Sequence, residues 1–254
     1  MDPLTLIGLA VASGAAGAVN AVAGGGTLIA FPALMAAGYS SKVANVTNTV
    51  AIWPGTIGGS LAYRRELGER GTRVAALTIP SVLGGLVGSV LLLSTSDQAF
   101  RAVVPFLIYF ACILLYLQPR LSKLTMLGVR SADDTTTTSP MLHVGIFLVG
   151  VYGGYFGAGI GILMLAILGI LAPDNLHHSN AIKGMLAMII NFTALVVFAL
   201  RADVAWGPAG VMAVASIVGG YVGVHFARRI SPRVLRTGII GYGAVIATVL
   251  LLQR

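Results

Sequence analysis

One lysine stands apart from the other charged residues of this chain. Lys183 falls about one turn into an apolar segment that starts near Ser179, whereas all eight aspartates and glutamates fall in loops or at segment ends. A charge inside a membrane segment is costly unless it faces a polar cavity or meets a counter-charge, and an anionic substrate could supply that counter-charge. The alternatives are a lysine that snorkels to the nearby interface or one that makes only a structural hydrogen bond.

Two glycine clusters offer backbone amides where a helix must be interrupted. Amides exposed at the start of the following helix, at the positive end of its dipole, favour an anion, so we predict that both clusters line a substrate site. Close helix packing through small residues is the alternative. The predicted members are Gly24, Gly25, Gly26 and Thr27 in the first cluster and Gly157, Gly159 and Gly161 in the second.

Asparagine and threonine are dense in the segments that follow the two clusters. We predict that four of them contact the substrate: Asn45, Thr47, Asn48 and Asn191. Hydrogen bonds between neighbouring helices are the alternative role. Thr47 falls opposite Lys183 when the two halves of the chain are aligned, which raises both as candidates, and Asn20 is a weaker one.

Other residue types exclude several functions. His177 and His178 have no third ligand at metal spacing and are expected in a solvated loop, and Cys112 is the single cysteine. No nucleophile with a base is recognisable, so we predict no enzyme activity, no metal and no cofactor. The net charge of +8 comes from basic residues in short loops, which indicates membrane orientation rather than nucleic-acid binding.

Composition defines the elements that position these residues. The chain is 57% hydrophobic and 9% charged, which predicts an all-α polytopic membrane protein in contact with the lipid bilayer. Two apolar stretches, 3–37 and 141–172, are broken in the middle by the glycine clusters. The other apolar segments are close to the roughly 20 residues that span a bilayer, and they cover 43–62, 74–94, 102–117, 181–200, 204–226 and 234–252.

The chain also resembles itself at an offset of about 135 residues. Gly84-Gly85-x-x-Gly88, for example, falls on Gly219-Gly220-x-x-Gly223, and we interpret these two runs as helix packing only. We therefore predict a first transmembrane repeat over 1–117, a cytoplasmic linker over 118–140 and a second transmembrane repeat over 141–254.

Basic residues decide how the broken stretches cross the membrane. If each stretch folds back as a hairpin, the basic residues divide 11 to 4 between the two sides, against 9 to 6 for a single pass. The positive-inside rule favours hairpins, with both termini outside the cytoplasm. Each half then has about five segments, and this odd number predicts inverted repeats. Residues 27–37 reach only about 17 Å, so this arm is expected to end partway through the roughly 30 Å hydrocarbon core.

These motifs resemble those of the TauE/SafE sulfite-exporter family over essentially the whole chain. The first copy comprises Gly24-Gly25-Gly26-Thr27, Phe31-Pro32-Ala33-Leu34, Ala44-Asn45-Val46-Thr47-Asn48-Thr49 and Tyr63-Arg64-Arg65; the second comprises Gly157-Ala158-Gly159-Ile160-Gly161, Asn180-Ala181-Ile182-Lys183 and Asn191. The resemblance implies export or exchange of sulfite, organosulfonates or related small organic anions. The second glycine cluster departs from an uninterrupted Gly-Gly-Gly, which puts equal roles for the two hairpins in doubt.

We therefore predict a secondary transporter of the cytoplasmic membrane that exports a small anion by alternating access. An anion channel, or a membrane subunit or assembly factor without transport activity of its own, is the alternative. The sequence leaves open the exact anion, the direction of transport, a coupling ion and a homo-oligomer.

Overall fold

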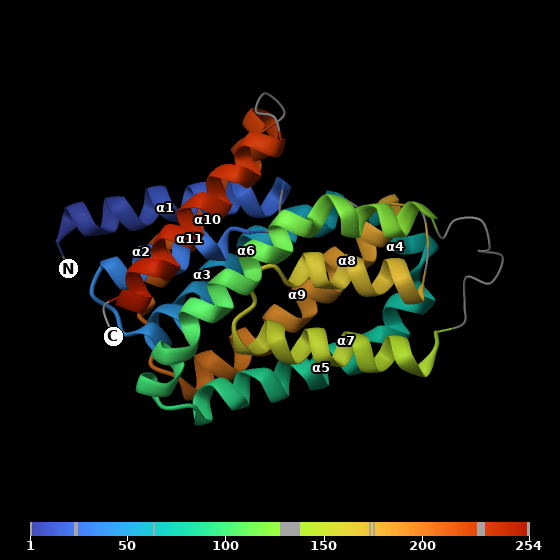
Figure 1. Ribbon diagram of the computed structural model, residues 1–254, viewed down its shortest axis with the longest axis horizontal. Coiled ribbons are helices and arrows are strands. Elements are labelled where there is room, and N and C mark those ends of the chain that lie inside the picture. The colour runs from blue at the N-terminus through green and yellow to red at the C-terminus, as the bar shows by residue number, and fades with distance from the viewer. Residues whose placement is uncertain are drawn as a thin grey trace.

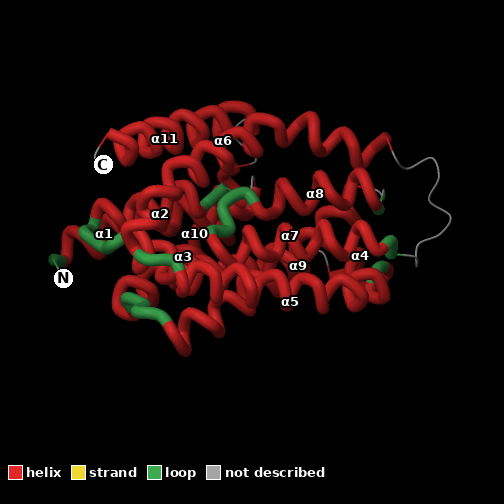
Figure 2. Tube along the Cα trace, turned by 60° about the horizontal axis from the view of Figure 1, so that its bottom comes forward, coloured by secondary structure: helices red, strands yellow, loops and turns green. Residues whose placement is uncertain are grey.

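The computed structural model describes residues 2–252 apart from 23–24, 63, 128–137, 173, 175 and 228–231. Every regular element in this part of the chain is an α-helix (Figures 1 and 2). The helices are α1 (Pro3–Val22), α2 (Thr27–Ala36), α3 (Ser41–Ala62), α4 (Arg64–Glu69), α5 (Gly71–Ser94), α6 (Asp97–Leu127), α7 (Pro140–Tyr155), α8 (Ile160–Leu171), α9 (Leu176–Arg201), α10 (Trp206–Ala227) and α11 (Pro232–Leu252).

Five described helices are long and apolar enough to cross a bilayer, namely α1, α5, α6, α9 and α11. Their outward faces carry large apolar side chains that the protein leaves uncovered, such as Ile79, Phe106 and Val245. Lipid rather than water suits such a surface, because a bilayer solvates apolar side chains without the cost of exposing them to water. The predicted class, an all-helical polytopic membrane protein, is confirmed.

The chain reverses at both glycine clusters. Gly26 packs against the carbonyl group of Ala16 in α1, and Gly145 in α7 packs against Ile167 in α8. In Figure 1, α2 lies beside α1 and α8 lies beside α7. The returning helices have 10 and 12 residues, about 15 and 18 Å in length, so each is shorter than the hydrocarbon core. The prediction of two hairpins with short second arms is confirmed.

Local sequence explains where these helices begin and end. The Ser139 hydroxyl accepts a hydrogen bond from the Leu142 amide and Pro140 occupies the first turn, a common start for α7. Gly38 ends α2 with a φ of +92°, which is unfavourable for residues with a side chain. In the second break, Gly157 and Gly159 have φ values of +79° and +77°, so this turn requires glycine at both positions.

Two pairs of helices pack through glycine at very short separation. In α5, a Cβ atom at Gly84 or Gly88 would overlap the carbonyl oxygens of Phe147 and Val151 of α7. In α10, Gly219 is equally close to Gly14 of α1. The interpretation of these glycines as packing residues is confirmed. Residues later in one helix of each pair contact residues later in its partner. The helices α1 and α10 are therefore parallel, and so are α5 and α7.

Hydrogen bonds join two further pairs of helices. The Tyr109 and Thr248 hydroxyls are 2.7 Å apart, and the Cys112 thiol donates to the Ile240 carbonyl at 3.8 Å, so α6 and α11 run antiparallel. The indole Nε1 of Trp53 donates to the Met188 carbonyl at 3.1 Å where α3 meets α9.

The helix α6 extends beyond the apolar segment from which it was predicted. The sequence suggested an apolar segment ending at 117, but α6 continues to Leu127, so residues 118–127 of the predicted linker are helical. This stretch contains residues that favour helices, including Leu121 and Lys123, and a helix does not have to stop where it leaves the apolar core. Residues 128–137 of the linker lie outside the described part of the chain. The short helix α4 was also not predicted.

Candidate functional site

Lys183 lies beside the start of the short helix α8. Its aliphatic chain runs past Gly161, where an added Cβ atom would be 3.4 Å from the lysine Cδ atom. Its ammonium group donates to the Asn180 side-chain oxygen at 2.9 Å, on the same helix. No carboxylate forms an ion pair with Lys183 among the described residues. The lysine charge and the positive end of the α8 dipole both favour a negative charge in this region, although the amides of Ile160, Ile162 and Leu163 already donate to carbonyls of the break.

The second break also contacts two predicted asparagines. The Asn45 side-chain amide donates to the Tyr155 carbonyl at 3.0 Å, which joins α3 to the end of α7. The side-chain oxygen of Asn191 would be 3.7 Å from a Cβ atom at Gly157. Together with Gly161 and Lys183, these residues surround the break from α3, α8 and α9. Gly159, the remaining predicted glycine, packs on Leu114 of α6.

Asn48 shares with Asn45, one turn earlier in α3, a buried side-chain oxygen without a described partner, but it lacks the hydrogen bond that the Asn45 amide donates. It is 2% exposed, and its side-chain oxygen has no hydrogen-bond partner among the described residues. A buried carbonyl oxygen without a partner costs about 1–3 kcal/mol. Packing therefore does not account for the polarity of Asn48, and its role as a substrate contact stays a prediction.

The structure does not bring Thr47 to Lys183. The Thr47 hydroxyl oxygen accepts a hydrogen bond from the Ala205 amide at 3.0 Å, and Ala205 lies in the loop between the end of α9 and the start of α10. Lys183 lies near the first residue of α9. Residues that match in a repeat occupy equivalent places on different helices rather than one common place, and the role of each as a substrate contact stays a prediction. Thr47 instead holds α3 against the loop after α9.

The first break is organised as a packed turn. The Gly26 amide donates to the Asn20 side-chain oxygen at 2.8 Å, so this predicted anion donor already has a partner. Gly25 is buried against Leu115 of α6, and Thr27 is half-buried. Gly24 lies outside the described residues. An array of free amides is therefore not seen in the described part of this break.

Aromatic side chains separate the two breaks, and the sequence analysis missed them. Phe31 of α2 meets Phe156 of the second break edge to face at 5.6 Å, and both rings are almost fully buried. Phe100 of α6 meets Tyr155 in the same way, also at 5.6 Å. The signal available in the sequence was an aromatic residue beside each glycine cluster. The Tyr152 hydroxyl, which donates to the Ala158 carbonyl at 2.6 Å, fixes the turn further.

An ionic cluster joins the loop before α9 to the start of α5. Arg70 donates to Asp174 at 2.6 and 3.1 Å, and Arg73 approaches the same carboxylate at 3.4 Å. The hydrogen bond with Asp174 raises the pKa of Arg70. His178 contacts Asp174 at 3.1 Å and Glu69 at 2.8 Å, so its prediction as a solvated loop residue is wrong. The reason is that α4 and α5 bring acidic and basic partners from a distant part of the chain.

This architecture defines a polytopic membrane protein with two broken, reversed helices whose ends meet on α6. The model of one family, described as "Sulfite exporter TauE/SafE", matches residues 9–250. The chain belongs to this family, and it is a membrane transporter.

Relatives in three bacteria cover most of the chain. The "Probable membrane transporter protein YfcA" of Escherichia coli K12 is 28% identical over 257 residues, covering 99% of this chain and 91% of the relative. A "Probable membrane transporter protein" of Haemophilus influenzae is 27% identical, covering 81% and 78%. The "Probable membrane transporter protein ORF9" of Sinorhizobium sp is 24% identical, covering 90% and 85%. There is no significant match among solved structures.

Proposed function

We propose that this transporter is a secondary transporter of the cytoplasmic membrane that exports a small anion: sulfite, an organosulfonate or a related organic anion. The observation that carries the proposal is the position of Lys183. Its aliphatic chain packs on the first turn of α8, and Asn180 is the described polar partner of its ammonium group. An anion between the lysine and the start of α8 would neutralise the lysine and be stabilised by the helix dipole. The family name gives the same class of substrate.

Alternating access is supported by the way the helices pair. At the predicted offset of about 135 residues, α1 corresponds to α7 and α10 to α5, so the parallel pairs α1–α10 and α7–α5 are counterparts. Trp53 and Met188, which are 135 residues apart, meet where α3 contacts α9. In an inverted repeat, the pairs α1–α10 and α7–α5 are each expected to be parallel, and the matching helices α6 and α11 are expected to be antiparallel. The observed directions agree with this expectation. Inverted repeats commonly move against each other around a central site.

Substitution of Lys183 tests the proposal. We expect Lys183→Ala to abolish sulfite or alkanesulfonate flux in proteoliposomes while the protein still inserts and purifies normally, because the anion loses its counter-charge. Arg201→Gln is the control, since this arginine is exposed at the other end of the same helix and should transport normally. Wild-type flux through Lys183→Ala would refute the assigned role.

The same liposomes separate the alternative functions. A transporter shows saturable flux, whereas an anion channel conducts without saturation. A subunit or assembly factor carries no flux when it is the sole protein present. These outcomes also apply to the wild type, so they do not depend on any substitution.

A further inference from the structure

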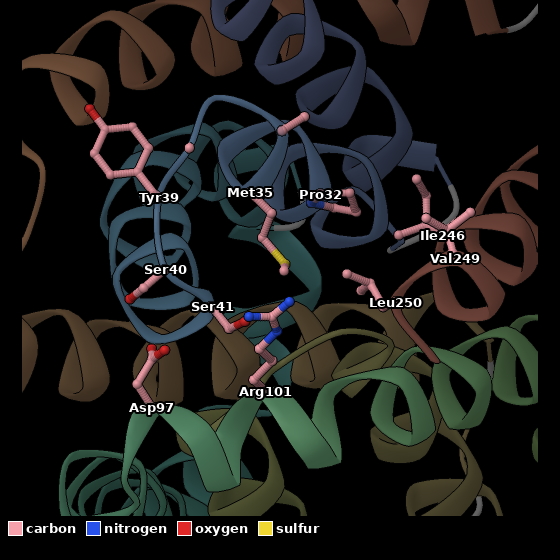
Figure 3. A pocket seen from close by; sticks show the side chains of 12 residues that line it. Pro32, Met35, Tyr39, Ser40, Ser41, Asp97, Arg101, Ile246, Val249 and Leu250 are labelled. Carbon is pink, nitrogen blue, oxygen red and sulfur yellow. The ribbon is translucent and has the colours of Figure 1, made fainter. Parts of the chain in front are cut away.

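A cavity of about 520 Å³ lies between α2, α6 and α11, at the end of the molecule where α11 finishes (Figure 3). One side of its lining is apolar, with Met35, Val249 and Leu250, and the other carries Ser41 and Arg101. Its size is within the range of small-molecule sites, which combine mostly apolar walls with a few polar groups. None of the residues predicted from the sequence as substrate contacts lines it.

Two polar groups in this pocket suit an anion. Figure 3 shows the Arg101 guanidinium extending among the lining side chains, close to Ser41 in this view. Ser41 is 2% exposed, and its hydroxyl has no hydrogen-bond partner among the described residues. A buried hydroxyl without a partner is costly, and an oxygen atom of a bound ligand would satisfy it. A guanidinium is a good partner for planar or tetrahedral oxyanions.

The carboxylate in the pocket is directed to other groups. Asp97 accepts a hydrogen bond from the Lys42 amide at 3.0 Å, at the start of α3. The Lys42 ammonium group is also nearby, where it donates to the carbonyls of Leu93 at 2.6 Å and Thr95 at 2.8 Å. Asp97 thus lies at the start of α3, where the positive end of the helix dipole partly offsets its repulsion of an anion.

The helices that line the pocket also contact the second glycine break. The lining residues Pro32 and Arg101 directly follow Phe31 and Phe100, the two rings that stack on Phe156 and Tyr155. The same two helices, α2 and α6, thus supply residues to the pocket and rings that contact the second break.

We propose that this pocket binds an organic anion that carries an apolar group, such as a short alkanesulfonate, with Arg101 and Ser41 on the oxyanion and α2 and α11 on the apolar part. This inference rests on the proposed function, because it names the substrate class of the same transport path. A bare inorganic anion leaves the apolar half of the pocket unfilled and binds more weakly. An anionic lipid has the same chemistry, so the test separates the two sources.

The experiment measures ligand binding by thermal stabilisation of the full chain in nanodiscs of phosphatidylcholine, without detergent. Hexanesulfonate is expected to stabilise the wild type saturably, sulfite much more weakly, and hexyltrimethylammonium not at all. Arg101→Gln is expected to raise the Kd for hexanesulfonate at least about tenfold, because a charge-assisted hydrogen bond is lost. Arg201→Gln, an exposed arginine outside the pocket lining, is the matched control and should bind like the wild type.

Several outcomes would overturn the pocket without affecting the proposed function. One is an unchanged Kd for hexanesulfonate in Arg101→Gln, and another is equal stabilisation by hexyltrimethylammonium. The third is that hexanesulfonate does not stabilise the protein, whereas phosphatidylglycerol in the nanodiscs does. If Arg101→Gln does not fold, Arg101→Lys and Ser41→Ala replace it, and each is expected to weaken binding. Lys183→Ala separates the two proposals, because it should lose transport yet still bind hexanesulfonate in the pocket.

Discussion

Asn45 and Asn48 lie one turn apart in α3 and are equally buried, yet their surroundings differ. Asn45 donates to the Tyr155 carbonyl, so it joins two helices, as the alternative interpretation of these polar residues expected. The side-chain oxygens of both residues have no partner among the described residues, so the difference is that Asn48 has no described hydrogen bond from its amide nitrogen. Residue type and spacing did not distinguish the two, because the partner of Asn45 lies 110 residues away in the sequence.

This contrast gives different expectations for the same substitution. Asn48→Leu removes a buried oxygen that lacks a partner, so thermal stability in detergent should be unchanged or higher, while anion flux should fall. Asn45→Leu also removes an unpartnered oxygen, but it leaves the Tyr155 carbonyl without its donor, so its free energy of unfolding should be lower than that of Asn48→Leu by about 1–3 kcal/mol. Normal flux through a stable Asn48→Leu protein would show that Asn48 has no part in transport.

At the scale of elements, the hairpins could be predicted and their environment could not. Glycine clusters in apolar stretches and the distribution of arginines are local properties, and they sufficed for the reversals at α1–α2 and α7–α8. At Gly157 and Gly159, the residue type itself indicates the positive φ that the turn adopts. The aromatic layer, the pocket at Arg101 and the partner of Thr47 depend on which helices become neighbours, and periodicity of one segment does not contain that information.

The ionic cluster at the start of α5 is expected to hold two elements together. Asp174→Asn would leave Arg70 and the buried Arg73 without their shared carboxylate, and removing one partner of a buried ion pair costs about 3–5 kcal/mol. We expect a clear fall in the unfolding temperature of the purified protein. Asp203→Asn is the comparison, since Asp203 is exposed after α9. Equal unfolding temperatures for both variants would contradict the assigned importance of the cluster.

At the scale of the whole molecule, the ends of the helices separate into two groups. The start of α1 and the end of α11 lie at one end, and α4 lies at the other (Figure 1). The basic loop residues divide in the same way, so we propose that the end with α4 is cytoplasmic. The family match establishes a membrane transporter but leaves this orientation to experiment.

Labelling with a membrane-impermeant maleimide measures the orientation. The native Cys112 is buried and should not react. Gln98→Cys, exposed at the start of α6, is expected to react in intact cells, whereas Gly68→Cys in α4 should react only after the membrane is permeabilised. The reverse pattern would place the termini in the cytoplasm.

The glycine-packed helix pairs have a consequence for the order of synthesis. The partner of α1 is α10 and the partner of α5 is α7, so each tight contact of the early helices waits for a helix made much later. Until then α1 and α5 must remain in the bilayer with their glycine faces against lipid. The first part of the chain is therefore expected to enter the membrane before its tight helix contacts can form. These contacts form only when α7 and α10 have been synthesised and displace lipid from the glycine faces.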